Sequence, residues 1–209
     1  MSNTRARLLL AHGAGQDSTS PFMQILPTLL QPADIEVLLF DFDYMLKARQ
    51  TGTKRPPERL PKLQAQFKAQ ISQHQKNNTL PLFIGGKSMG GRVASTLIEE
   101  VDGVIGAICL GFPFHPPGKI EKLRLVSLQN QTKPTLILQG TRDPFGKRDE
   151  VLDYALSEQV AIRFIEDGDH SFKPRKSSGL TWQQNMIHAA REITHFIKQN
   201  IGLDATRPR

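Results

Sequence analysis

Short apolar runs alternate with amphipathic segments along the whole chain. A turn that contains Gly or Asp follows each run. The runs are residues 7–11, 35–40, 80–84, 104–110, 134–138 and 160–165. Near-continuous apolar runs of this length are typical of strands in a parallel sheet whose two faces are both buried. The pattern therefore predicts a mostly parallel sheet of about six strands.

Between the runs, apolar residues recur at the spacing of an amphipathic helix. These stripes occur at residues 60–71, 93–101 and 182–196. The alternation favours an α/β fold in which helices flank the sheet and the crossovers are right-handed. Two connections are longer than usual, from Asp41 to about Pro57 and from Phe112 onward, but neither has the length of a lid domain. We expect a single domain over residues 1–209.

Composition narrows the class of protein. The chain has 27 Lys and Arg against 20 Asp and Glu, a net charge of +7, but acidic residues are interspersed with the basic ones. No nucleic-acid-binding motif accompanies the charge, so a nucleic-acid partner is the weakest alternative. The single Cys excludes a disulfide framework and a Cys-based zinc site. No apolar run approaches the ~20 residues of a membrane helix, and residues 8–11 are too short for a signal peptide, so we predict a cytoplasmic protein without a membrane partner.

The segment Gly86-Lys87-Ser88-Met89-Gly90 matches the pattern G-x-S-x-G. It lies between a predicted strand and a predicted helix, which is the setting of a nucleophile elbow. In so tight a turn, side chains two residues before and after the serine would clash, and Gly86 and Gly90 remove them. The N-terminus of the helix also favours negative charge developing at the serine. Ser88 is therefore the candidate nucleophile.

A serine hydroxyl needs a base within hydrogen-bond reach, and the base needs an acid that orients it. In hydrolases with this elbow the chain order is Ser, acid, His. Asp143 and His170 follow the serine in this order, and each comes just after a predicted strand. Asp41 and Asp43 precede the serine, which is the wrong order, and Asp169 is expected to point away from the neighbouring histidine.

Acyl transfer also needs two N–H donors for an oxyanion. One is expected from Met89, the residue after the nucleophile, and the other from the loop after the first strand, where Ala14 is the candidate. His12 begins this loop and is expected to brace it by hydrogen bonds. Cys109 lies within a predicted strand and is expected to be a small buried residue.

With these motifs, the sequence resembles the α/β-hydrolase superfamily over nearly its whole length. It is similar to a small lidless subfamily that includes bacterial dienelactone-hydrolase-like proteins, a testis-expressed animal protein and a subunit of a chromatin acetyltransferase complex. The resemblance is carried by residues 85–92, 112–118, 139–146 and 168–172. It implies Ser88 as the nucleophile, Asp143 as the acid and His170 as the base. It also implies an α/β-hydrolase fold whose first strand corresponds to the third of the full fold, which leaves six parallel strands.

Aromatic residues near the motifs are candidates for the walls of the substrate site. Phe114, His115 and Phe145 are the candidate substrate-binding residues, with Phe112 and Phe172 as further walls. Packing in the core is an equal alternative for the phenylalanines, and a surface position is an equal alternative for the histidine.

Two cations, Lys87 and Arg92, flank the elbow against the preference of the helix dipole. Pairing with Asp41 or Asp43 accounts for them without a function. The alternative hypothesis is that they select anionic substrates. It fails if Lys87→Met leaves unchanged the ratio of kcat/KM for carboxylate-bearing over neutral esters.

Together these features predict a serine hydrolase of the carboxylesterase or thioesterase type. It is expected to cleave small soluble acyl esters through an acyl-enzyme, with no metal and no other cofactor. The alternative is a non-catalytic binding or scaffold module that keeps the fold, because a fold does not guarantee an activity. The sequence leaves the oligomeric state open.

Overall fold

The computed structural model describes residues 4–76 and 78–202, and six strands form one sheet in the order β2-β1-β3-β4-β5-β6. The strands are β1 (Ala6–Ala11), β2 (Ile35–Phe40), β3 (Leu82–Lys87), β4 (Val104–Leu110), β5 (Thr135–Gly140) and β6 (Val160–Ile165). Every neighbouring pair is parallel. The predicted α/β fold with a six-stranded sheet is confirmed, and within the described residues no lid domain covers it.

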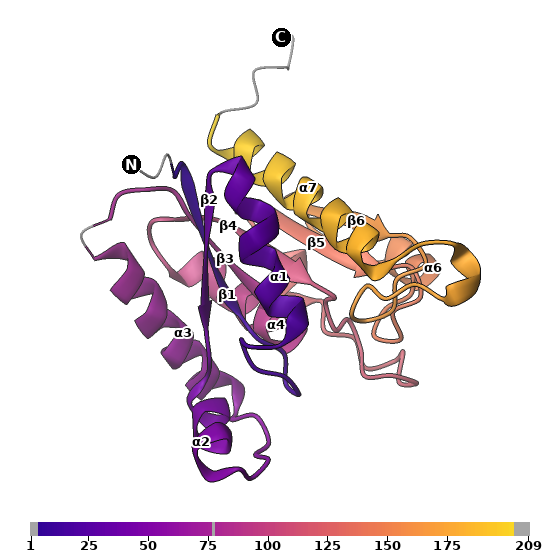
Figure 1. Cartoon of the computed structure of the whole chain (residues 1–209), viewed down its shortest axis with the longest axis horizontal. Coiled ribbons are helices and arrows are strands. Elements are labelled where there is room, and N and C mark those ends of the chain that lie inside the picture. The colour runs from indigo at the N-terminus through magenta and orange to yellow at the C-terminus, as the bar shows by residue number, and fades with distance from the viewer. Residues whose placement is uncertain (1–3, 77, 203–209) are drawn as a thin grey trace.

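Helices cover both faces of the sheet (Figure 1). α1 and α7 pack together on one face, and α3 and α4 pack together on the other. The helices are α1 (Pro21–Leu30), α2 (Asp43–Thr51), α3 (Leu60–Gln75), α4 (Met89–Leu97), α5 (Val126–Gln129), α6 (Arg148–Leu152) and α7 (Trp182–Asn200). Single 3₁₀ turns lie at Gln31–Ala33, Ile98–Glu100 and Lys176–Ser178. No helix in the described part of the chain is long and apolar enough to cross a bilayer.

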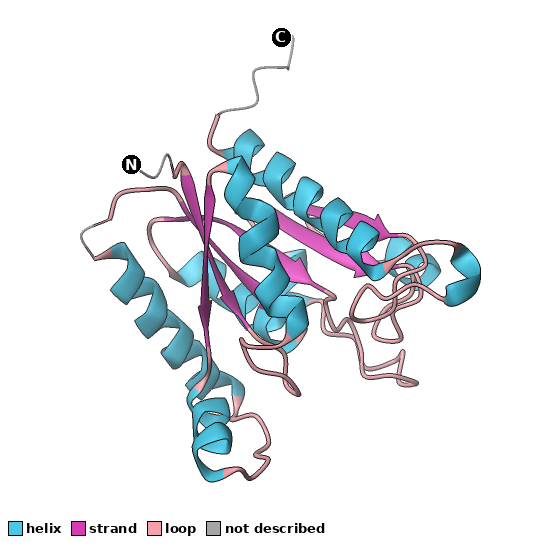
Figure 2. Ribbon diagram, viewed as in Figure 1, coloured by secondary structure: helices cyan, strands magenta, loops and turns pink. Residues whose placement is uncertain are grey.

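The strands form the middle layer of the molecule, between the two sets of helices (Figure 2). In β1, Leu8 and Leu10 pack with α1 and α7, whereas Leu9 and Ala11 pack with α3 and α4. Successive side chains of a strand point to opposite faces, so a strand covered on both faces is apolar throughout. This is why the runs in the sequence are continuous rather than alternating.

β3 differs from its prediction because it continues through two glycines. The sequence predicts an end at Ile84, but the strand runs to Lys87. A Cβ on Gly85 would lie 2.0 Å from the carbonyl oxygen of Ile108 in β4. The glycine therefore permits close strand pairing here, rather than ending the strand.

Four helices were not predicted, and α5 and α6 among them are only four and five residues long. α2 lies inside the connection after Asp41, and Tyr44 is its buried residue, so no apolar stripe marks it. α1 contains Pro27, which is unfavourable inside a helix. The helix predicted from the stripe at residues 93–101 ends earlier than the stripe, because α4 ends at Leu97 and the chain continues in a 3₁₀ turn.

Candidate active site

The turn between β3 and α4 is strained and closely packed. Ser88 has φ 50° and ψ −108°, a conformation that side-chain-bearing residues rarely adopt. A Cβ on Gly86 would lie 2.3 Å from the carbonyl oxygen of Ala11, and one on Gly90 would lie 2.4 Å from the same atom. The predicted steric role of these two glycines is therefore confirmed. The turn holds Ser88 at the carboxyl edge of the sheet.

Behind the turn, α4 approaches β4 closely. A Cβ on Gly91 would lie 3.1 Å from the Cα of Cys109. The Cys109 thiol donates to the carbonyl oxygen of Gly91 at 3.3 Å, and burial raises its pKa to about 12. The thiol is buried and protonated near neutral pH, so the expectation that Cys109 is a packing residue is confirmed.

Ser88, His170 and Asp143 form a continuous chain of hydrogen bonds. Nε2 of His170 lies 2.9 Å from Oγ of Ser88, and Nδ1 lies 2.8 Å from Oδ2 of Asp143. Asp143 follows β5 and is fully buried, and its Oδ1 accepts a 2.9 Å hydrogen bond from the Phe145 N–H. His170 comes from the loop after β6. The carboxyl ends of β3, β5 and β6, on the same edge of the sheet, thus bring the three side chains together.

The other acids near the site have different partners. Asp41 accepts hydrogen bonds from Ser18 and from Arg49. The Asp169 carboxylate accepts hydrogen bonds from the N–H groups of Ser171 and Lys173. The expectation that Asp169 points away from the imidazole is confirmed.

The loop after β1 is held in place by His12. The Phe42 N–H donates to Nε2 of His12 at 3.1 Å, so Nδ1 carries the proton and donates to the Gly13 carbonyl oxygen at 2.6 Å. Burial lowers the pKa of His12, which favours this neutral form. The predicted bracing role is therefore confirmed, and it fixes the position of Ala14.

Ala14 and Met89 lie close to Ser88. Both line the same hollow as the serine. Met89 is the first residue of α4, so its N–H has no acceptor within the helix. The two predicted oxyanion residues therefore border the same space as the serine.

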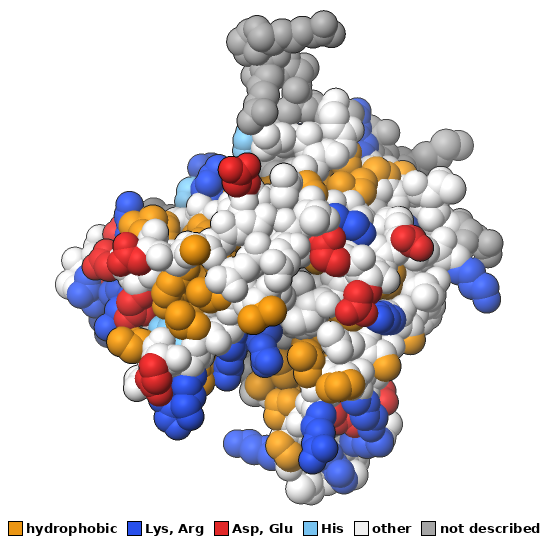
Figure 3. Space-filling model, turned by 180° about the vertical axis from the view of Figure 1, so that it is seen from behind, with side chains coloured by type: hydrophobic (Ala, Val, Ile, Leu, Met, Phe, Trp, Pro, Cys, Tyr) orange, Lys and Arg blue, Asp and Glu red, His pale blue; other side chains and the backbone are white. Residues whose placement is uncertain are grey.

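Two hollows of about 290 Å³ each open beside Ser88. The His170 hollow is lined by Ala14, Phe22, Lys87, Ser88, Phe145 and His170, among others. The Arg92 hollow is lined by Leu60, Leu63, Ser88, Met89, Arg92 and Arg124, among others. From behind, the surface is notched between the lobe that carries α2 and the rest of the molecule, with Lys or Arg and hydrophobic side chains beside the notch (Figure 3).

Two of the three predicted substrate-binding residues do not reach these hollows. Phe114 is fully buried against Phe112, and the His115 ring is buried with Nε2 at 3.1 Å from Glu150. The Pro-rich connection folds inward and packs against β4 and β5, so these residues belong to the core. Phe172 is likewise buried.

Phe145 is the predicted aromatic residue that does lie at the site. It lines both hollows, and its ring centroid is 4.3 Å from that of His170. It therefore covers one side of the imidazole and borders both spaces beside Ser88.

The predicted pairing of Lys87 and Arg92 with Asp41 or Asp43 is wrong. The Lys87 ammonium donates to the carbonyl oxygen of His170, and burial lowers its pKa to about 8. Arg92 forms no ion pair within residues 4–76 and 78–202, and it lies near Arg124. The sequence did not indicate Arg124 as a residue of the site. Arg124 carries no motif, and only the fold of the connection after β4 brings it to the site.

The buried Lys87 makes folding stability depend on pH. Its folded pKa of about 8 is below the ordinary 10.5, so between these values the unfolded chain binds more protons and stability rises with pH. We expect the unfolding free energy of the wild type, relative to Lys87→Met, to rise by on the order of 2 kcal/mol from about pH 7 to about pH 10. Urea unfolding at both pH values measures this, and a constant or falling difference contradicts it.

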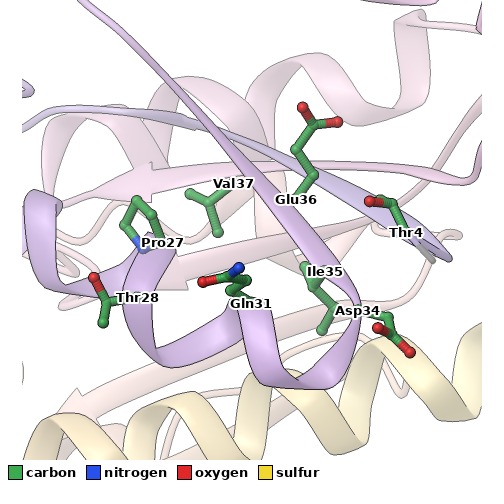
Figure 4. A pocket seen from close by; sticks show the side chains of 8 residues that line it. All are labelled: Thr4, Pro27, Thr28, Gln31, Asp34, Ile35, Glu36 and Val37. Atoms are coloured by element: carbon green, nitrogen blue, oxygen red, sulfur yellow. The ribbon is translucent and has the colours of Figure 1, made fainter. Parts of the chain in front are cut away.

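A larger hollow of about 550 Å³ lies elsewhere, against Thr4, Asp34 and Glu36 (Figure 4). It sits at the amino ends of β1 and β2, whereas Ser88, Asp143 and His170 are at the carboxyl edge. Ligands of open α/β sheets bind at the carboxyl edge, so we place the functional site there. Among the described residues, no group of three or more His, Cys, Asp or Glu is placed to hold a metal ion.

Comparisons with known proteins agree with this fold. A family model described as an alpha/beta hydrolase domain matches residues 4–198. The chain is similar to the esterase Pf2001 from Pyrococcus furiosus, with a TM-score of 0.72 and 17% identity over 95% of this chain and 85% of that one. It is also similar to Est1E from Butyrivibrio proteoclasticus, with a TM-score of 0.70 and 14% identity over 95% and 89% of the two chains. A dienelactone hydrolase from Anabaena variabilis matches with a TM-score of 0.67 and 19% identity over 95% and 88%.

Proposed function

Because the chain belongs to the alpha/beta hydrolase domain family, we propose that it is a serine hydrolase of the carboxylesterase or thioesterase type. The observation that carries the proposal is the hydrogen-bond chain from Ser88 through His170 to Asp143, with distances of 2.9 and 2.8 Å. This geometry supplies a nucleophile, a base and an orienting acid in one place.

In the first half of the reaction, Ser88 Oγ attacks the carbonyl carbon of an ester or thioester. Nε2 of His170 takes the hydroxyl proton and then gives it to the departing alcohol or thiol. Asp143 accepts the hydrogen bond of Nδ1–H, which keeps the required tautomer and stabilises the imidazolium. The product of this half is an acyl group on Ser88.

The negative oxygen of each tetrahedral intermediate needs donors that are already in position. We assign this role to the N–H groups of Ala14 and Met89, which border the same space as the serine. The N-terminus of α4 adds a favourable dipole. Each such donor is worth about 2.7–4 kcal/mol of barrier in enzymes of this type.

In the second half, water replaces the alcohol. His170 takes a proton from the water, the water oxygen attacks the acyl carbon, and Ser88 leaves with the proton that His170 returns. The products are a carboxylic acid and the free enzyme. One structure of the similar protein Est1E holds ferulic acid, a carboxylic acid, which supports a small acid as the product class.

The size of the two hollows predicts a preference for short acyl chains. Each is about 290 Å³ and open to solvent, at the lower end of the range for ligand sites. We expect kcat/KM for para-nitrophenyl esters to be highest for acetate or butyrate and to fall for octanoate and laurate. Rates with laurate above those with acetate contradict this size limit, and no hydrolysis of any ester above that of heat-unfolded protein contradicts the proposed function.

A further inference from the structure

Two arginines, Arg92 and Arg124, line the Arg92 hollow beside Ser88. Arg92 lies in the first turn of α4. Arg124 lies in the connection between β4 and α5, where its backbone N–H donates to the Phe114 carbonyl oxygen. Both side chains are half-buried. Within the described residues, neither guanidinium forms an ion pair or a hydrogen bond with a carboxylate.

The acid in this hollow is already engaged. Glu58 lines the same space, but its carboxylate pairs with Lys62 and accepts a 2.6 Å hydrogen bond from Gln66. Burial raises the pKa of Glu58, but the hydrogen bonds from Lys62 and Gln66 lower it, and the net result is a lowered pKa. The carboxylate is therefore already bound to these two side chains. It does not neutralise the two arginines.

Without a bound anion, the two neighbouring positive charges of Arg92 and Arg124 are unfavourable in the folded protein. Burial and the nearby charge of Arg124 lower the pKa of Arg92, and a cation in the first turn opposes the dipole of α4. An anionic ligand group would remove the repulsion and meet planar donors suited to two oxygens. The same space is open to Ser88 and Met89 and has apolar walls at Leu60 and Leu63.

We propose that Arg92 and Arg124 form a binding site for an anionic group, carboxylate or phosphate, on the substrate whose ester bond is cleaved at Ser88. The inference rests on the proposed esterase function and narrows its substrate to esters with a negative charge a few bonds from the scissile carbonyl. Lys87 does not share this role, because its ammonium is bound to the His170 carbonyl oxygen.

Pairs of esters that differ in one charge test the site. para-Nitrophenyl hydrogen adipate and its methyl ester place the charge on the acyl side, and para-acetoxybenzoate and its methyl ester place it on the leaving group. para-Acetoxyphenylphosphonate separates phosphate-like from carboxylate ligands. The readout is the ratio of kcat/KM for the charged over the neutral member, which cancels effects on Ser88 chemistry shared by both.

We expect the wild type to prefer the charged member of at least one pair by about tenfold or more. Arg92→Gln and Arg124→Gln should each lower this ratio about tenfold, since a charged hydrogen-bond donor is lost. Arg191→Gln on α7 is the matched control, because it removes the same charge from an exposed position and should leave the ratio unchanged.

The outcomes separate this inference from the esterase function. Hydrolysis of the neutral esters without preference for charge, or an unchanged ratio in both arginine variants, overturns the anion site and leaves the esterase function standing. If no ester is cleaved, calorimetry on Ser88→Ala still decides. The charged member of at least one pair should bind, its methyl ester should not, and adding Arg92→Gln should abolish binding; binding of no charged member, or equal binding of charged and neutral members, overturns the site.

Discussion

Replacing His170 with alanine should lower kcat for ester hydrolysis by about 10⁶-fold. The imidazole is the group within hydrogen-bond reach of both the Ser88 hydroxyl and the Asp143 carboxylate. Without it, the hydroxyl keeps its proton and the departing group receives none. Steady-state hydrolysis of para-nitrophenyl acetate measures the loss, and far-UV circular dichroism verifies that the variant is folded. A kcat within tenfold of the wild type contradicts the assigned base.

The acid gives a matched comparison with a second carboxylate, which lies next to His170 in the chain. In Asp143→Asn the amide no longer favours the Nδ1–H tautomer, so kcat should fall by about 10⁴-fold. Asp169→Asn removes an equal charge one residue from His170, but the Asn oxygen still accepts from the Ser171 and Lys173 N–H groups. The second variant should keep most of its activity. Equal losses of kcat in both variants would show that the negative charge near His170, rather than control of its tautomer, supports catalysis.

The second large effect concerns the elbow itself. Gly86→Ala should destabilise the protein by about 3 kcal/mol. Its Cβ would lie 2.3 Å from the Ala11 carbonyl oxygen and 2.7 Å from the Gly90 carbonyl carbon, and both are backbone atoms that move only if β1 or α4 shifts. Denaturant unfolding gives the free energy.

Gly15→Ala is the control for this prediction. It adds the same methyl group in the neighbouring loop, where no other atom lies within 4 Å, so its effect should be within about 0.5 kcal/mol. Failure of Gly86→Ala to fold while Gly15→Ala folds agrees with the account. Equal stability of the two variants contradicts the steric explanation of the elbow.

The sheet was predictable because both of its faces are covered. Leu8 to Leu10 face two cores in turn, so every residue is apolar and the run stands out. The same logic fails for α2, where Tyr44 is the fully buried residue and most of the other side chains are exposed. It also fails at Gly85, where a residue that usually marks a turn serves close strand pairing.

The juxtaposition of Ser88, Asp143 and His170 was predictable from chain order and strand ends alone. The pocket walls were not, because they depend on how one irregular connection folds. Phe114 and His115 share their segment with Arg124, yet the first two turn into the core and the third lines the hollow beside Ser88. Nothing in the local sequence distinguishes these directions.

A fluorophosphonate probe tests the central claim most directly, because it reacts with a serine only where the hydroxyl is activated and an oxyanion site is formed. The probe is added to wild-type protein, Ser88→Ala and heat-unfolded protein, and the adduct is located by peptide mass spectrometry. The account predicts a stoichiometric adduct on Ser88 of the folded wild type and none in the other two samples. A folded wild type that stays unlabelled, or is labelled elsewhere, would contradict it and favour a binding module that keeps the hydrolase fold.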